Sequence, residues 1–99
     1  MTAKRSPLVP EVPALAEALP GVDVYGWYAI AAPAGTPAAI VEKVHAAALS
    51  ALKQPNVATS LAGFGMTAAP MDAAGLSGYM KEEVERWSAL IREAGIQPQ

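Results

Sequence analysis

The chain has 99 residues, of which 53% are hydrophobic, and its formal net charge is −2. This length allows one domain at most, and the hydrophobic content is too high for a disordered chain. The small charge, with no basic cluster beyond Lys4 and Arg5, disfavours nucleic acid as a partner. Without cysteine and with one histidine, the chain has neither disulfides nor a thiolate metal site, and we expect no cofactor.

The first expected element is a short helix that follows a proline-rich coil. Prolines recur between residues 6 and 13, where they favour extended or turning backbone. Pro13 suits the first turn of a short helix over residues 14–19, and Pro20 with Gly21 ends that helix. No apolar stretch of the kind found in a signal peptide follows the first residues, so we expect no signal peptide in this chain.

Residues 22–32 form the most distinctive stretch. They alternate between two faces and are rich in β-branched and aromatic side chains, which predicts one long strand. Both faces are largely apolar from Tyr25 onward, as in a strand covered on both sides in an α/β sheet. Residues 66–69 predict a second, short strand. Because a lone strand leaves unpaired backbone groups on both edges, we expect a homodimer or higher oligomer through strand 22–32, or sheet neighbours in a larger protein.

Helices complete the expected fold. Thr36 is predicted to cap a helix over residues 37–53, which has proline at its first position. Proline also opens a shorter helix over residues 55–62. Asp72 is predicted to cap the last helix, over residues 73–94, with glycine directly after it. The predicted fold class is therefore α/β, with one long strand, one short strand and three to four helices.

No set of side chains predicts catalysis or metal binding. His45 lies alone in the middle of a helix, so a structural or solvated role is expected. Glu82, Glu83 and Glu85 crowd the last helix, where we interpret them as a solvated face rather than an acid–base pair. No serine stands in the sequence context of a catalytic nucleophile. We therefore expect that the protein is not an enzyme.

Three aromatic residues of the predicted long strand are candidates for a binding role. Tyr25, Trp27 and Tyr28 are placed to line a small-molecule cleft or a hinge, although aromatic side chains on a strand more often belong to a core. Both interpretations stay open on the residues alone.

Several blocks of the sequence, taken in order, resemble one known family. Residues 2–18 are similar to a pattern of the form TSAKRSxxLPDVPTxAEAG. The block WYAIAAPAGTP at residues 27–37 resembles the pattern WYGLFAPAGTP, and EVERW at 83–87, followed by AGI at 94–96, resembles the closing EIAKW…AGI. The family is that of the tripartite tricarboxylate transporter substrate-binding proteins, also called Bug receptors.

The resemblance implies a fold and a function. Such receptors have two α/β domains joined by a hinge, in a fold like that of other periplasmic binding proteins. Residues 1–99 are then a single incomplete domain, the C-terminal portion of a larger periplasmic receptor. The intact protein is expected to capture a small carboxylate solute by hinge closure and to deliver it to membrane transporter subunits. Tyr25, Trp27 and Tyr28 are then the ligand-binding or hinge candidates.

A different interpretation is a small stand-alone α/β interaction module that dimerises through residues 22–32 and has no role in transport. The sequence upstream of Met1 separates the two, because a receptor gene continues there into a further domain and a signal peptide. The sequence does not identify the solute.

Overall fold

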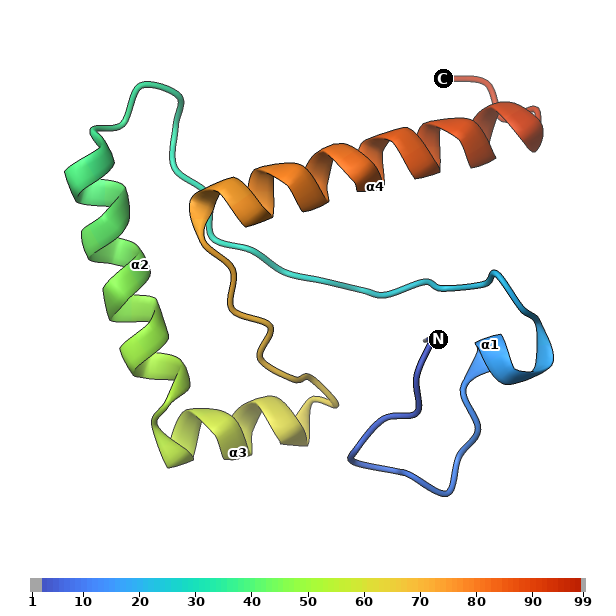
Figure 1. Cartoon of the computed structure of the whole chain (residues 1–99), viewed down its shortest axis with the longest axis horizontal. Coiled ribbons are helices and arrows are strands. Elements are labelled where there is room, and N and C mark those ends of the chain that lie inside the picture. The colour runs from blue at the N-terminus through green and yellow to red at the C-terminus, as the bar shows by residue number, and fades with distance from the viewer. Residues whose placement is uncertain (1–2, 99) are drawn as a thin grey trace.

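The part of the chain that the structure describes, residues 3–98 of a computed structural model, folds into four helices joined by extended and turning segments (Figure 1). The helices are α1 (Leu15–Ala18), α2 (Ala38–Leu52), α3 (Pro55–Gly63) and α4 (Ala73–Glu93). Their number and order agree with the helices expected from the sequence, and each boundary lies within two residues of the expected one. None of these helices is long and apolar enough to cross a membrane.

Capping chemistry explains where the longest helix begins and ends. Asp72 is the N-cap of α4, as predicted, and its Oδ1 accepts a hydrogen bond from the backbone N–H of Gly75 at 2.7 Å. This bond satisfies one of the N–H groups that the first turn of a helix leaves without a partner. At the other end, Ala94 is the C-cap, and Gly95 adopts a left-handed φ of 67°. Glycine adopts this conformation without the steric penalty of a Cβ atom.

The prediction that Thr36 caps α2 is wrong by one position. Pro37 occupies the N-cap, where its fixed φ suits the entry into the helix. The Thr36 hydroxyl donates instead to the carbonyl of Pro33 at 2.8 Å, and the Thr36 backbone N–H donates to the same oxygen at 3.2 Å. Threonine therefore closes the turn before the helix rather than the helix itself.

The predicted α/β fold class is also wrong, because no strand forms anywhere in residues 3–98. Residues 22–32 run as a stretched trace beside α4, and residues 66–69 form part of the connection from α3 to α4 (Figure 1). Alternating side chains indicate extended backbone, but extended backbone becomes a strand only when a second one pairs with it. Here the neighbour of residues 22–32 is a helix, which offers side chains and no backbone ladder.

The helices are loosely assembled. α2 and α3 contact each other, whereas α4 packs on the stretched segment away from them (Figure 1). Among the hydrophobic side chains of residues 3–98, only Ala14 is buried, with 5% exposed. The accessible surface is 8089 Å², against about 5,300 Å² for a compact protein of this mass. The radius of gyration is 16.7 Å, against about 13 Å for a compact domain of this length. Residues 3–98 therefore do not enclose a hydrophobic core.

Candidate functional site

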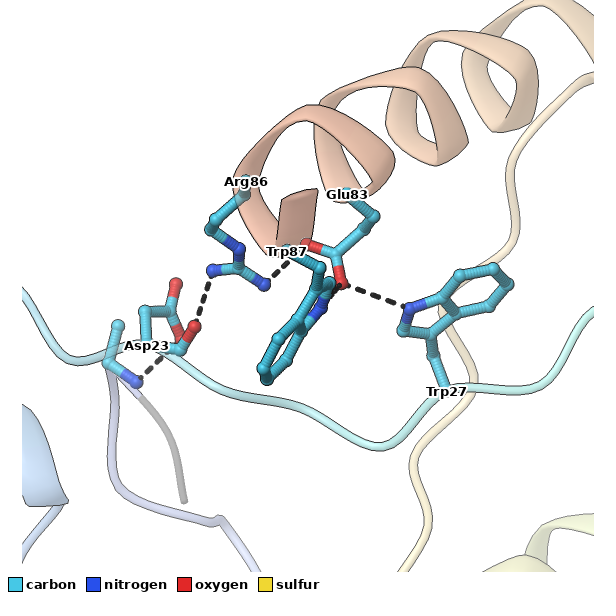
Figure 2. Close-up of polar contacts among 6 residues, drawn as sticks. Asp23, Trp27, Glu83, Arg86 and Trp87 are labelled. Carbon is cyan, nitrogen blue, oxygen red and sulfur yellow. Dashed lines mark hydrogen bonds and ion pairs between the residues drawn. The ribbon is translucent and has the colours of Figure 1, made fainter. Parts of the chain in front are cut away.

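Five residues join the stretched segment to α4, and we call them the Glu83 clasp. They are Asp23, Trp27, Glu83, Arg86 and Trp87 (Figure 2). The indole Nε1 of Trp27 and that of Trp87 each donate to Oε2 of Glu83, both at 3.2 Å. Arg86 donates through Nη2 to the other oxygen, Oε1, and through Nη1 to the backbone carbonyl of Asp23. The clasp therefore holds the segment at two points, Asp23 and Trp27.

The carboxylate of Glu83 is the buried charge of the clasp. Only 7% of the residue is exposed, and no other polar residue among 3–98 is classed as buried. Burying a carboxylate is unfavourable unless opposite charge and hydrogen-bond donors compensate for lost water. Arg86 supplies the charge, and the indole N–H groups supply two further donors. The Nε atom of Arg86 is itself buried and has no hydrogen-bond partner.

Aromatic packing supports the same contact. The rings of Trp27 and Tyr79 meet edge to face, with centroids 5.5 Å apart and an interplanar angle of 75°, an arrangement that aromatic pairs favour. Burial raises the pKa of the Tyr79 hydroxyl, and the negative charge of Glu83 raises it further. On the other side of the carboxylate, the guanidinium of Arg86 lies 5.8 Å from the ring centre of Trp87.

Two hollows flank the Glu83 carboxylate. The first, of about 250 Å³, is mostly apolar, and the second, of about 200 Å³, is polar. The apolar hollow is lined by Trp27, Met80, Glu83, Val84 and Trp87. The polar hollow is lined by Asp23, Tyr25, Tyr79, Glu82, Glu83 and Arg86. Because carboxylates outnumber the one arginine in the polar hollow and the apolar one offers no cation, neither suits an anionic ligand.

The three aromatic candidates lie in different environments. Trp27 belongs to the clasp, and Tyr25 lines the polar hollow. Tyr28 is 85% exposed and is not among the residues that line either hollow. The structure therefore brings two of the candidates to α4 and leaves the third open to solvent.

Glu83 is the residue that sequence reasoning missed, since it was interpreted as part of a solvated face. That interpretation is wrong for Glu83 and holds for Glu82 and Glu85, which are both exposed. A signal was present in the spacing. Glu83 stands four residues after Tyr79 and four before Trp87, and residues four apart share one face of a helix. The same register makes Glu83, three residues before Arg86, the partner of that arginine.

The Glu83 clasp does not present a free general base. The two oxygens of Glu83 accept from three donors, so the carboxylate is not free to take a proton from a substrate. His45 is half-buried in the middle of α2. Within residues 3–98, no cluster of three or more histidine or acidic side chains is arranged to hold a metal ion. What the site presents is a carboxylate that accepts three hydrogen bonds among aromatic and apolar side chains.

The comparison with known families identifies the class of protein. The profile of the family described as "Tripartite tricarboxylate transporter family receptor" matches residues 1–96. The chain belongs to this family of transporter receptors, which confirms the resemblance seen in its sequence blocks. Receptors of the family are periplasmic and bind solutes for tripartite transporters, so the prediction that the protein is not an enzyme is also confirmed.

Curated relatives extend the comparison. The chain is 41% identical over 91 residues to the UPF0065 protein in the tcbD-tcbE intergenic region of a Pseudomonas species, which covers 90% of this chain and 27% of that protein. It is 38% identical over 98 residues to the UPF0065 protein in the TAR-I ttuE-ttuC' intergenic region of Agrobacterium vitis, which covers 95% of this chain and 28% of that protein. It is 29% identical over 96 residues to Protein BugT of Bordetella pertussis, which covers 96% of this chain and 29% of that protein. The chain thus spans little more than a quarter of these relatives. No solved structure matches.

Proposed function

We propose that the intact protein is a periplasmic receptor that captures a small carboxylate-type solute and delivers it to the membrane subunits of a tripartite tricarboxylate transporter. The family match over residues 1–96 carries this proposal. Residues 1–99 then contribute a single incomplete domain, the C-terminal portion of the receptor. Capture follows from closure of two domains about a hinge, which encloses the solute between them.

The large accessible surface supports the proposal of an incomplete domain. The accessible surface of 8089 Å² exceeds the value of about 5,300 Å² for a compact protein of this mass by about 2,800 Å². Permanent interfaces bury roughly 2,000–5,000 Å² in total, summed over both partners, so an excess of this size on one partner is enough for such an interface. The matched relatives are more than three times as long as the matched segment. The remainder of such a receptor supplies enough chain to cover this surface.

Among the three candidate residues, Tyr28 is best placed to touch a solute. The residue is 85% exposed, whereas Trp27 already donates its one N–H group to Glu83. Tyr25 lines a hollow with an excess of carboxylates, which repels an anion. A tyrosine hydroxyl donates a hydrogen bond to a carboxylate without introducing charge. We therefore assign solute contact to Tyr28, with Tyr25 and Trp27 forming the wall behind it.

Calorimetric titration with dicarboxylate and tricarboxylate ions tests the function. The chain alone is expected to show no micromolar binding, because the opposing half of the clamp is absent. A chimera in which this chain replaces the matching segment of BugT provides the second half, and it is expected to bind one of these ions. Micromolar binding by the chain alone would contradict the proposal that the chain forms only one half of the clamp. A folded chimera that binds none of the ions would overturn carboxylate capture.

For the chain made alone, we propose association of copies through residues 22–32. Tyr28 and Ile30 in this segment are 85% and 76% exposed, and exposed apolar side chains favour association. Light scattering is expected to report a dimer or a higher oligomer. A monomer that retains a full near-ultraviolet circular dichroism signal contradicts this proposal.

A further inference from the structure

The two most distinctive blocks of the sequence meet at one carboxylate. Trp27 begins the first block, and Glu83, Arg86 and Trp87 belong to the closing block, 56 positions along the chain. We propose that Glu83 is a positioning residue, whose carboxylate sets where the aromatic segment lies on α4 and which of its aromatic side chains faces outward. The inference rests on the proposed function in one respect, because that segment is the candidate wall of the solute cleft.

Each tryptophan can form only one hydrogen bond of this kind, so the choice of acceptor fixes where its ring lies. An indole has one N–H donor and no acceptor, so each tryptophan forms one such hydrogen bond. Both tryptophans of the chain use it on the same oxygen of Glu83, one from the segment and one from α4 itself. The ring of Trp27 is therefore held in place by α4, and it has no second donor with which to bind elsewhere.

Arg86 attaches the segment to α4 at a second point. Its guanidinium links Glu83 to the backbone carbonyl of Asp23. Two attachment points on one extended segment, Asp23 and Trp27, fix both its position and its direction along α4 (Figure 2). A single attachment would leave the segment free to rotate about it.

The orientation of Tyr28 follows from these two attachments. Successive side chains of extended backbone point to opposite sides. With Trp27 turned toward Glu83, its neighbour Tyr28 is turned away, and the exposed fractions are 39% and 85%. A slip of one residue would exchange the two sides. Glu83 thus determines that the tyrosine, and not the tryptophan, is presented to solvent.

The indole N–H signals in a proton–nitrogen NMR spectrum test the role of Glu83 without any solute. The chain has two tryptophans, so two signals are expected. Both should lie away from the position of free tryptophan and exchange slowly with water. In Glu83→Met, which keeps the length of the side chain and removes the acceptor, both signals should move together to the free position. Their exchange should accelerate about tenfold or more, as expected for the loss of a hydrogen bond to a charged group.

Matched variants separate positioning from general stability. Glu85→Met changes an exposed carboxylate on the same helix and should leave both signals unchanged. Glu83→Gln keeps an acceptor oxygen and should move both signals only part of the way. If Glu83→Met does not fold, Trp27→Phe serves instead. The remaining Trp87 signal should then shift, because Oε2 of Glu83, which accepts the Trp87 N–H, has lost the N–H of Trp27. Tyr28→Phe, at the neighbouring exposed position, should not move that signal.

A second readout follows the accessibility of the two indoles. In folded Glu83→Met, acrylamide quenching of tryptophan fluorescence should rise, because both indoles lose the hydrogen bond that holds them at Glu83. The proposal is overturned if Glu83→Met leaves both indole signals in place, or if only the Trp87 signal moves. Solute titration of the chimera is independent of these spectra. If the chimera binds no solute while the two indole signals of the chain respond as described, the proposed function is refuted and the positioning role stands.

Discussion

The indole N–H of Trp27 donates to the carboxylate of Glu83 at 3.2 Å across 56 positions of sequence. This contact makes α4 the structural partner of residues 22–32, in the place where a sheet neighbour had been expected. The edge-to-face packing of Trp27 on Tyr79 adds an apolar contact at the same point. Helix and segment are therefore joined by a small polar centre with aromatic walls.

Removal of the Glu83 carboxylate should destabilise the chain. Glu83→Ala leaves Arg86 and both indole N–H groups without their acceptor, and loss of a hydrogen bond to a charged group is unfavourable by about 2 kcal/mol. Urea unfolding followed by tryptophan fluorescence measures the change. Glu85→Ala, on an exposed position of α4, is the control and should stay within about 0.5 kcal/mol of the parent. Equal effects of the two substitutions would show that the clasp contributes nothing.

The N-cap of α4 gives a second prediction. Asp72→Ala removes the acceptor for the Gly75 N–H and should lower stability by about 1 kcal/mol. The loss should begin in the first turn, where Gly75 and Gly78 already weaken the helix. Asp72→Ser keeps a capping oxygen and should retain most of the stability. Far-ultraviolet circular dichroism with thermal unfolding measures both variants, and an alanine variant as stable as the serine variant argues against the cap.

Acid should release the N-terminal segment from α1. Arg5 donates to Glu17 through Nε at 2.6 Å and Nη2 at 2.7 Å, and Glu17 also accepts the Ala14 N–H at 2.9 Å. These bonds lower the pKa of Glu17 from 4.5 to about 2, with the Arg5 hydrogen bond as the largest cause. Since the folded pKa is depressed, the stabilisation is present above about pH 4.5 and is lost as the pH falls toward 2.

An NMR titration of the Glu17 carboxyl carbon checks this pH dependence. The midpoint should lie near pH 2 in the parent and move toward 4.5 in Arg5→Met, which keeps a long side chain without charge. High salt should also raise the midpoint, because the pair is exposed and salt screens such interactions. An unchanged midpoint in Arg5→Met contradicts the assignment of the shift to Arg5.

Self-association should respond to charge in the exposed part of the stretched segment. Ile30→Lys places a cation where a 76% exposed apolar side chain stands, so like charges would meet in an association of copies. The variant is expected to shift the light-scattering mass toward the monomer. Ile96→Lys, at a similarly exposed position after α4, is the control and should leave the mass unchanged. The same mass for parent and Ile30→Lys places the contact elsewhere.

Local rules account for the helices that could be predicted from sequence. Asp72, Pro55 and Gly95 act within one helical turn, and their effects are encoded by neighbours in the chain. The strand could not be derived in this way, because pairing depends on a distant segment that local alternation does not specify. Residues 22–32 show the alternation of a strand, and their neighbour in space is a helix.

The Glu83 clasp marks a similar limit. Trp27 was predicted as a candidate for a cleft, and Glu83 was predicted as solvated, since neither sequence position reveals the other. The helical register placed Glu83 between Tyr79 and Trp87, but a charged residue within an apolar stripe has no predicted partner until the fold supplies one. The resemblance to the receptor family identified both blocks and said nothing about their contact.

Nuclear Overhauser contacts from the ring of Trp27 test the central claim most directly, which is that α4 of the same chain holds the stretched segment. We expect contacts to the side chains of Tyr79 and Met80 in a uniformly labelled sample. In an isotope-filtered experiment on mixed labelled and unlabelled chains, those contacts should be absent, because they lie within one chain. Their absence from the first sample, or their appearance between chains in the second, would contradict the account.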